Sequence, residues 1–396
     1  MQPEASIPSG LPTPGRDALT HSERTAAFIQ QALEGGGGRL SFGEFMHLAL
    51  YAPSHGYYAA GAEKFGAEGD FVTAPEVSTL FGRVVAQQCA EALRALGGGS
   101  VLELGAGSGA LAMSMIDRLA ELNVRPERYQ ILDVSPDLIA RQQALLLPLA
   151  ERNGTPIEWL DRMPDSLNGV VIANEVIDAL PVERFRCFRG KLEQQYVVPD
   201  GAAFAPLWAP ASEAVKAAVA EIEADLGRTF PNGYQSEVSL ALGDWVGQLA
   251  ESLDDGILLL FDYGLPRHEY YAMDRGQGWL QCHFRHHAHR SPLIYPGIQD
   301  LTAWVDFSAV AHAAARNGLE VAGFVTQAMF LLNGGLDNEF QAFDALSEVD
   351  QLRLSQEVKR LTLPTEMGEN FKCLGLRRSG GPSLSAFAQQ DRTPSL

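Results

Sequence analysis

The chain of 396 residues has no long hydrophobic run, because its longest aliphatic stretch, Ile257 to Phe261, is far too short to cross a bilayer. Membrane insertion is therefore not expected. Cysteine is also scarce, and the four cysteines are scattered without metal-ligand spacing or a dense disulfide pattern. The first twenty residues lack the basic start and apolar stretch of a secretory signal, and they hold less arginine than a mitochondrial presequence. Together these absences predict a cytoplasmic protein.

Basic residues are a further shortage. The chain has 30 Lys and Arg against 49 Asp and Glu, which gives a formal net charge of -19. Such a field repels polyanions, so nucleic-acid binding that depends on neutralising phosphates is not expected. A cationic partner, or a cationic cofactor such as a sulfonium, suits the field better, although many proteins are acidic for solubility alone.

The length exceeds that of one average domain, so we expect either one large domain with insertions or two domains. The Gly- and aromatic-rich stretch from residue 55 to residue 75 has no clear period, which is typical of a functional loop. Composition and hydrophobic period divide the chain into a disordered tail (1–20), an N-terminal helical and lid region (21–98), an α/β domain in two stretches (99–200 and 256–378), an inserted cap (201–255) and a second disordered tail (379–396).

From residue 100 onward, short apolar strands alternate with helical segments, a pattern that predicts a βαβ domain. The fold class is α/β, a Rossmann-like sheet of seven strands with helices on both faces and a final antiparallel pair. The predicted strands are 100–104, 129–134, 155–159, 169–174, 256–263, 320–326 and 371–377.

Polar residues end three of these strands, where ligands collect in open α/β sheets. In the first turn, Gly105, Gly107 and Gly109 let a ligand approach the backbone, and the helix that follows presents unpaired N–H groups. Asp133 ends the second strand, where an acid accepts hydrogen bonds from ribose hydroxyls. The pair Asn174-Glu175 ends the fourth strand, where the reacting end of the cofactor should lie.

The glycine turn also satisfies the dinucleotide pattern, as Gly105-x-Gly107-x-x-Ala110. Glu103 argues against a dinucleotide, because an acid before the first glycine can hold the amino group or ribose of S-adenosylmethionine but would repel a pyrophosphate. The antiparallel seventh strand also favours S-adenosylmethionine over a dinucleotide. The prediction is therefore a methyltransferase that binds S-adenosylmethionine.

Several longer stretches resemble the MidA-type methyltransferases, the family of mitochondrial complex I assembly factor 7. Among them are GDFVTAPEVS (69–78), VLELGAGSGAL (101–111), SPDL (135–138), IANEVIDALPVERF (172–185) and MGENFKCLGLR (367–377). The resemblance covers roughly residues 22–378. It implies a class I methyltransferase sheet and methylation of a protein arginine in a respiratory complex I subunit, with a symmetrically dimethylated product.

The resemblance also implies where ligands bind. The reacting arginine is expected near Asn174, Glu175 and Asp178. Ala106 departs from the family, in which many members have proline there, and so does the His-rich segment 282–289. The cofactor contacts that we expect from turn, strand ends and lid are Glu103, Gly105, Ala106, Gly107, Gly109, Asp133, Ser135, Asp70, Phe71, Thr73 and Asn174.

The chemistry assigns roles within this set. A guanidinium is charged at any cellular pH, and a carboxylate can hold it bidentately. We therefore expect Glu175 to clamp the arginine, with Asp178 in support; the alternative is that Glu175 caps a helix over 176–180. For Asp70, Phe71 and Thr73, the alternative to a closing lid is ordinary loop packing.

Histidines 283, 286, 287 and 289 raise the alternative of a metal site. Arg285 and Arg290 are interleaved with them and no cysteine pair accompanies them, so a solvated or substrate-facing loop is favoured and no metal is predicted. Two other functions stay open from sequence: a methyltransferase for a small molecule, and a binding or assembly protein whose cofactor site is vestigial.

Overall fold

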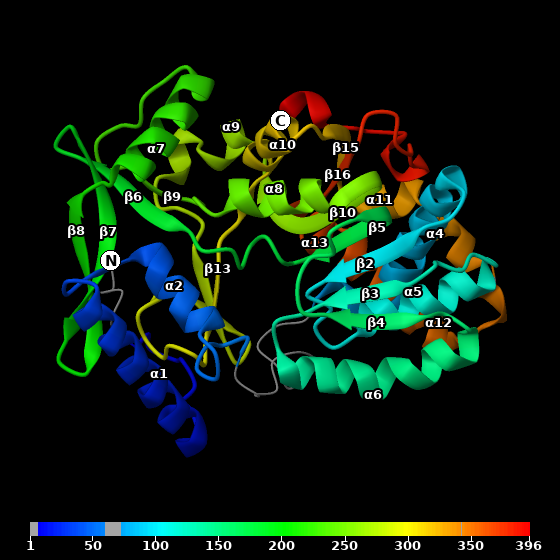
Figure 1. The fold of residues 1–396 in the computed structure, drawn as a ribbon, viewed down its shortest axis with the longest axis horizontal. Coiled ribbons are helices and arrows are strands. Elements are labelled where there is room, and N and C mark those ends of the chain that lie inside the picture. The colour runs from blue at the N-terminus through cyan, green and yellow to red at the C-terminus, as the bar shows by residue number, and fades with distance from the viewer. Residues whose placement is uncertain (1–6, 60–72, 342) are drawn as a thin grey trace. The chain divides into compact units, whose positions relative to one another are not determined.

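The computed structural model describes residues 7–59, 73–341 and 343–396, and the chain divides into two compact units (Figure 1). The sheet unit comprises residues 72–177, 243–266 and 305–396, and the accessory unit comprises residues 1–71, 178–242 and 267–304. This division corrects the predicted boundaries. The accessory unit includes the N-terminal segment, and its second portion begins at Asp178 rather than at residue 201.

The sheet unit contains one sheet in the order β15-β16-β10-β5-β2-β3-β4, with β14 beside β10. Strands β10 to β4 run parallel along this order, and β16 runs antiparallel to both of its neighbours. All seven predicted strands are present, and β14 is a short addition. Their bounds are β2 Ser100–Leu104, β3 Tyr129–Leu132, β4 Ile157–Leu160, β5 Leu167–Asn174, β10 Leu253–Leu265, β14 Val305–Asp306, β15 Glu320–Thr326 and β16 Phe371–Arg377.

Both faces of this sheet are buried, as parallel sheets require. Val101 and Leu102 are successive residues of β2 that point to opposite faces, and both are fully buried. On the face of Val101, α4, α5 and α11 contribute to one apolar cluster. The helices of the unit are α3 Ala74–Val77, α4 Thr79–Leu96, α5 Ala110–Glu121, α6 Pro136–Asn153, α8 Leu242–Ser252, α10 Phe307–Arg316, α11 Gln327–Asn333, α12 Glu348–Thr362 and α13 Met367–Asn370.

The strand order places the site. The sheet grows in one direction from β2 through β3 and in the other through β5, so the crevice beyond their carboxyl ends is the switch point where ligands bind. The turn after β2 and the residues that end β3 and β5 are the three segments singled out from the sequence.

The C-terminal segment is ordered, which corrects the predicted disordered tail at 379–396. Phe387 is 7% exposed, and a Cβ added at Gly323 or Gly375 would lie 2.4 or 2.6 Å from its side chain. The two glycines of β15 and β16 therefore make room for this ring. Asp391 Oδ1 also accepts a hydrogen bond from the Phe324 N–H at 2.9 Å. At the other end, α1 begins at Arg16, so the predicted tail 1–20 is also too long.

The accessory unit holds a five-stranded sheet, β1-β7-β6-β9 with β8 on β7, and a three-stranded sheet, β12-β11-β13. The strand pair predicted near 184–198 is present as β6 and β7, but it belongs to this unit. The bounds are α1 Arg16–Gly35, β1 Leu40–Ser41, α2 Phe42–Tyr51, β6 Glu183–Phe188, β7 Lys191–Asp200, β8 Ala203–Pro210, α7 Glu213–Leu226, β9 Gln235–Val238, α9 Arg267–Tyr270, β11 Gln281–Phe284, β12 His287–His289 and β13 Asp300–Thr302.

Among the residues that the structure describes, no helix combines the length and the apolar character needed to span a membrane.

Candidate cofactor and substrate site

The glycine turn after β2 is a bend that only glycine adopts easily. Gly105, Gly107 and Gly109 have φ of 62°, 55° and 86°, all in the left-handed region. A Cβ at Gly105 would also lie 3.2 Å from Val176 Cγ2. Gly109 is the N-cap of α5 and brings no side-chain cap to the first N–H groups of that helix. Ala106 closes the bend, because its carbonyl accepts from Gly109 N–H at 2.8 Å.

Asp133 lies just beyond β3 and is tied to the glycine bend through one glutamine. Gln142 Nε2 donates to Asp133 Oδ2 at 2.8 Å and to the Gly107 carbonyl at 2.9 Å. Trp159 Nε1 donates in turn to Gln142 Oε1 at 3.0 Å. Burial raises the pKa of the Asp133 carboxyl above its ordinary value, against hydrogen bonds that lower it. This network fixes the acid beside the bend, and the sequence analysis missed Gln142 and Trp159.

Ser135 and Thr73 are two further described residues that the sequence predicts to contact the cofactor. The Ser135 N–H donates to Asp133 Oδ1 at 3.0 Å, while its buried hydroxyl caps α6 by accepting from Leu138 N–H. Thr73 is the N-cap of α3 without a side-chain cap bond. The predicted lid residues Asp70 and Phe71 lie outside the described residues.

Glu103 lies in the strand just before the bend, and the residue is only 2% exposed. Tyr129 of β3 donates its phenol to Glu103 Oε2 at 2.5 Å. Burial raises the pKa of Glu103 to about 7, with a smaller rise from Asp133, and the Tyr129 hydrogen bond opposes it. In this structure the carboxylate therefore faces Tyr129 within the unit, and its predicted contact with the cofactor stays a prediction.

Asn174 and Glu175 end β5 at the same edge of the sheet as the bend. Asn174 Nδ2 donates to Glu175 Oε1 at 3.2 Å, and among the described residues Asn174 Oδ1 is buried without a hydrogen-bond partner. Glu175 has φ of 54°, a left-handed conformation that is rare outside glycine, and its N–H donates to the Phe261 carbonyl at 2.8 Å. Residues 176–180 form turns rather than a helix, so the helix that Glu175 was suggested to cap is absent.

The turn after Glu175 is held by a buried acid of β10. Asp262 is fully buried, and its Oδ2 accepts from the Ile177 N–H at 2.9 Å while Oδ1 accepts from the Tyr263 N–H. Asp262 therefore fixes the backbone two residues after Glu175. Strained backbone that is held in this way is a recurring property of functional sites.

Asp178, the third predicted substrate residue, belongs to the accessory unit. It is 5% exposed and lies among aromatic and acidic groups: Tyr51 Oη donates to the Ala179 carbonyl at 2.9 Å, and Tyr58 Oη donates to Asp300 Oδ1 at 3.0 Å. The two tyrosine rings stack with centroids 5.5 Å apart. Burial, Asp178 and Asp300 raise the pKa of both phenols. The sequence analysis missed Tyr51, Tyr58 and Asp300, although the HGYY stretch was a signal for the second tyrosine.

The His-rich segment forms a hairpin of β11 and β12. Its turn contains Arg285 and His286 with φ of 48° and 62°, and Cys282 pairs with His289 across the strands. Burial, and to a smaller extent His283, lowers the pKa of His289 to about 4. Within the described ranges no group of three or more His, Cys, Asp or Glu side chains could hold a metal ion.

A family model described as S-adenosyl-L-methionine-dependent methyltransferase, Methyltransf_28, matches residues 84–325. The protein arginine methyltransferase NDUFAF7 homolog, mitochondrial, of Drosophila melanogaster is 32% identical, over 86% of this chain and 82% of its own. Protein arginine methyltransferase NDUFAF7, mitochondrial, of Danio rerio is 30% identical, over 85% and 82%. A Burkholderia thailandensis crystal structure with bound S-adenosyl-homocysteine is 39% identical, with a TM-score of 0.91, over 98% of this chain and 100% of that one.

These relatives overturn one prediction. The cytoplasmic localisation expected from the sequence is wrong, because the curated relatives are named mitochondrial proteins.

Proposed function

Because the chain belongs to the Methyltransf_28 family of S-adenosyl-L-methionine-dependent methyltransferases, we propose that it transfers the methyl group to an arginine of a protein. Family membership confirms the predicted class I methyltransferase fold and the predicted cofactor. The arginine and its carrier protein are the proposed part. The observation that carries the proposal is the pair Asn174-Glu175, a carboxylate and an amide at the end of β5 where methyl transfer should occur.

The residues present fit the cofactor. The bend of Gly105, Gly107 and Gly109 leaves backbone open where side chains would otherwise stand, and α5 begins there without a side-chain cap. Asp133 is a half-buried acid beside the bend, suited to accept from the two ribose hydroxyls. Asn174 Oδ1 is a buried acceptor without a partner among the described residues, as a site for an ammonium or guanidinium donor requires.

When bound, the sulfonium of S-adenosylmethionine supplies the methyl group as an electrophile. A guanidinium nitrogen forms the new bond to that methyl carbon as the carbon–sulfur bond breaks, S-adenosylhomocysteine is released, and the nitrogen loses its proton to solvent. This displacement needs alignment more than a strong base. Glu175 holds the guanidinium through charge-assisted hydrogen bonds. The left-handed backbone of Glu175 and the hydrogen bond from the Ile177 N–H to Asp262 fix the direction in which the Glu175 side chain leaves the backbone. Asn174 accepts from a neighbouring guanidinium N–H or from the cofactor amine.

Asp178, three residues after Glu175 in the chain, is the second acid that we propose to attract the substrate arginine. Its surroundings favour positive charge, since Asp178 and Asp300 both lie near the stacked rings of Tyr51 and Tyr58. Aromatic faces and carboxylates together attract guanidinium groups. The half-buried tyrosines can therefore contact an arginine while the acids behind them supply the field.

The carrier protein that we propose is a subunit of respiratory complex I, and the product is symmetrically dimethylated arginine. The support is the resemblance to complex I assembly factor 7 and the names of the relatives, which are protein arginine methyltransferases. The net charge of -19 is consistent with a cationic protein segment as substrate.

Replacement of one carboxylate tests the role of Glu175. In Glu175→Gln, kcat should fall about 100-fold, since the guanidinium is held less firmly in the attack geometry. Affinity for S-adenosylmethionine, measured by calorimetry, should change little. The matched control is Glu151→Gln, which removes the same charge from an exposed position of α6. Near-normal methylation by Glu175→Gln with normal cofactor binding would remove this residue from the mechanism.

A further inference from the structure

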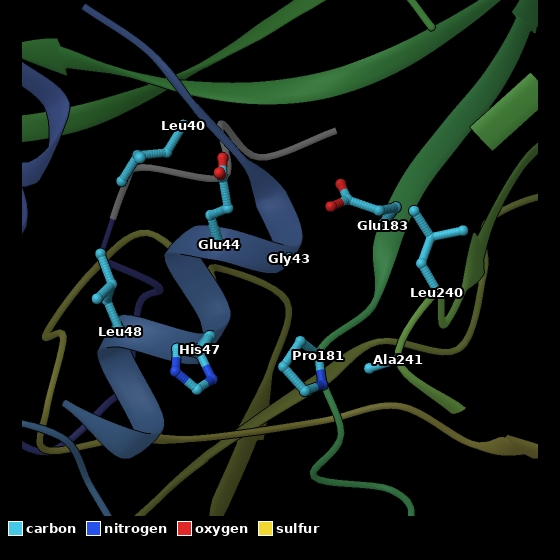
Figure 2. A pocket seen from close by; sticks show the side chains of 9 residues that line it. All are labelled: Leu40, Gly43, Glu44, His47, Leu48, Pro181, Glu183, Leu240 and Ala241. Atoms are coloured by element: carbon cyan, nitrogen blue, oxygen red, sulfur yellow. The ribbon is translucent and has the colours of Figure 1, made fainter. Parts of the chain in front are cut away.

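The accessory unit has a pocket of about 410 Å³ that the proposed reaction does not use. Figure 2 shows it between α2, which carries Glu44, His47 and Leu48, and the facing segments that carry Pro181, Glu183 and Leu240. Its volume lies within the range of ligand pockets, roughly 300–1,000 Å³. Its lining is Leu40, Gly43, Glu44, His47, Leu48, Pro181, Glu183, Leu240 and Ala241.

The walls are mainly apolar and remain partly open to solvent. Leu240 is 41% exposed and Leu48 is half-buried, and Pro181 lies near Ala241, across from His47 (Figure 2). A large aliphatic side chain with this exposure offers apolar surface that a partner can cover at little cost in free energy. The methylene stem of a long side chain would fit against these walls.

Both charges that line the pocket are negative. Glu44 is exposed and keeps one oxygen in the capping box of α2, where Oε2 accepts from the Ser41 N–H at 2.7 Å. Glu183 is buried and accepts from Ser41 Oγ at 2.6 Å and Gln194 Nε2 at 2.8 Å. Burial raises the pKa of the Glu183 carboxyl, and the negative charge of Glu44 adds to the rise. A bound cation would relieve the repulsion between these acids, and no Lys or Arg stands among the described residues that line the pocket.

The pocket adjoins the surroundings of Asp178 within the same unit. His47 lies one turn before Tyr51 on α2, with ring centroids 5.7 Å apart, and Tyr51 Oη donates to the Ala179 carbonyl. Ser239 Oγ donates to the Pro181 carbonyl, which joins the Leu240 segment to the chain that leads from Asp178. A protein segment whose arginine is near Asp178 can therefore reach the pocket with a neighbouring side chain.

We propose that this pocket binds a second basic side chain, lysine or arginine, of the protein substrate, with its stem against Leu48 and Leu240 and its charge at Glu44. The inference rests on the proposed function for the identity of that protein as the methyl acceptor. It makes the accessory unit a specificity element, which selects an arginine by a basic residue nearby in the sequence.

The test uses the full chain and fluorescein-labelled Gly/Ser peptides that contain one central arginine. A lysine is moved through successive positions on both sides of the arginine, and binding is measured by fluorescence polarisation at low ionic strength. At one position the lysine should tighten binding about tenfold over the lysine-free peptide. Glu44→Gln should lose most of this gain, and it keeps the capping box because glutamine serves at that position. Leu240→Ser should also lose most of the gain, because it removes part of the apolar wall.

Two matched variants serve as controls. Glu213→Gln removes the same charge from the exposed first turn of α7, and Leu207→Ser makes the same exchange at another leucine that is 41% exposed, on β8. Both should keep the full gain. The proposal is overturned when no lysine position tightens binding, or when both pocket variants retain the gain.

Methylation of the same peptides separates this proposal from the proposed function. A lysine-dependent KM that is lost in Glu44→Gln with unchanged kcat supports both. Lysine-dependent binding without transfer to arginine would refute the proposed function and leave the pocket intact. If arginine is methylated but neither the lysine position nor either pocket variant changes KM, the proposed function stands and the proposed role of the pocket is refuted.

Discussion

The replacement of the buried Glu103 by glutamine should stabilise the protein at neutral pH. Glu103 is 2% exposed, and its carboxylate is bonded to the Tyr129 phenol. Burial raises its pKa from 4.5 to about 7, so ionisation of this group opposes folding. Glutamine is neutral at every pH and its amide oxygen can still accept from Tyr129. The variant therefore removes the charge and keeps the hydrogen bond.

The pH dependence has a definite sign. Below pH 4.5 the Glu103 carboxyl is protonated in both the folded and the unfolded state. Its ionisation then takes nothing from the free energy of unfolding, which has its full value. As pH rises from 4.5 to about 7, the unfolded chain loses a proton that the folded protein retains, so the free energy of unfolding falls. At about 1.4 kcal/mol per pH unit this rise in pKa corresponds to about 3 kcal/mol, which is lost in full above pH 7.

Urea unfolding at 25 °C between about pH 4.5 and pH 8 measures this difference. Glu103→Gln should match the wild type at the acid end and exceed it by up to about 3 kcal/mol at the alkaline end. Glu151→Gln, an exchange at an exposed site, should give a pH-independent difference near zero. A Glu103→Gln variant whose difference from the wild type does not grow with pH would refute the account of a buried, protonated carboxyl.

Three further predictions concern the cofactor site and the C-terminal segment. Asp133→Asn should weaken S-adenosylmethionine binding about 10- to 100-fold in calorimetry, because a charge-assisted hydrogen bond to the ribose is lost. The control Asp137→Asn, at an exposed position, should bind the cofactor with near wild-type affinity, and equal affinity of the two variants would remove Asp133 from the site. Gly105→Ala should lose about 1–2 kcal/mol of unfolding free energy, because alanine must adopt φ of 62° and its Cβ approaches Val176; an unchanged urea midpoint would contradict this. Phe387→Ala should lower the free energy of unfolding by about 3 kcal/mol, because the Phe387 ring is buried over β15 and β16. If the variant unfolded thermally at the wild-type midpoint, the C-terminal segment would not stabilise the sheet.

The sheet unit was predictable from sequence because its signals are local. Strands β15 and β16 have the predicted bounds, and the glycine bend, Asp133 and Asn174 lie at the carboxyl ends of three strands. Each of these features is encoded in a run of neighbouring residues, and the parallel pairing of βαβ strands then brings the carboxyl ends of these strands to one edge.

The accessory unit was not predictable in the same way. Alternating apolar residues indicate that β6 and β7 are strands, but they do not say which sheet these strands join, because strand pairing is a long-range property. Asp300 and Tyr58 likewise meet from distant parts of the chain. Sequence periodicity carries no information on such contacts.

The C-terminal segment shows where composition misled. Residues 379–396 are rich in Ser, Gly and Pro, which predicts disorder, yet Phe387 is buried. A signal was present in the two strands beneath it, since a glycine inside a strand marks close approach by another group. Gly323 and Gly375 are those glycines.

The most direct test of the proposed arginine methylation uses S-adenosylmethionine with a deuterated methyl group and mass spectrometry of isolated complex I subunits. The account predicts deuterated methyl on an arginine side-chain nitrogen of one subunit, and its loss when Glu175→Gln replaces the wild-type enzyme. Label on another residue type or on a small molecule, or no label on any subunit, would contradict it.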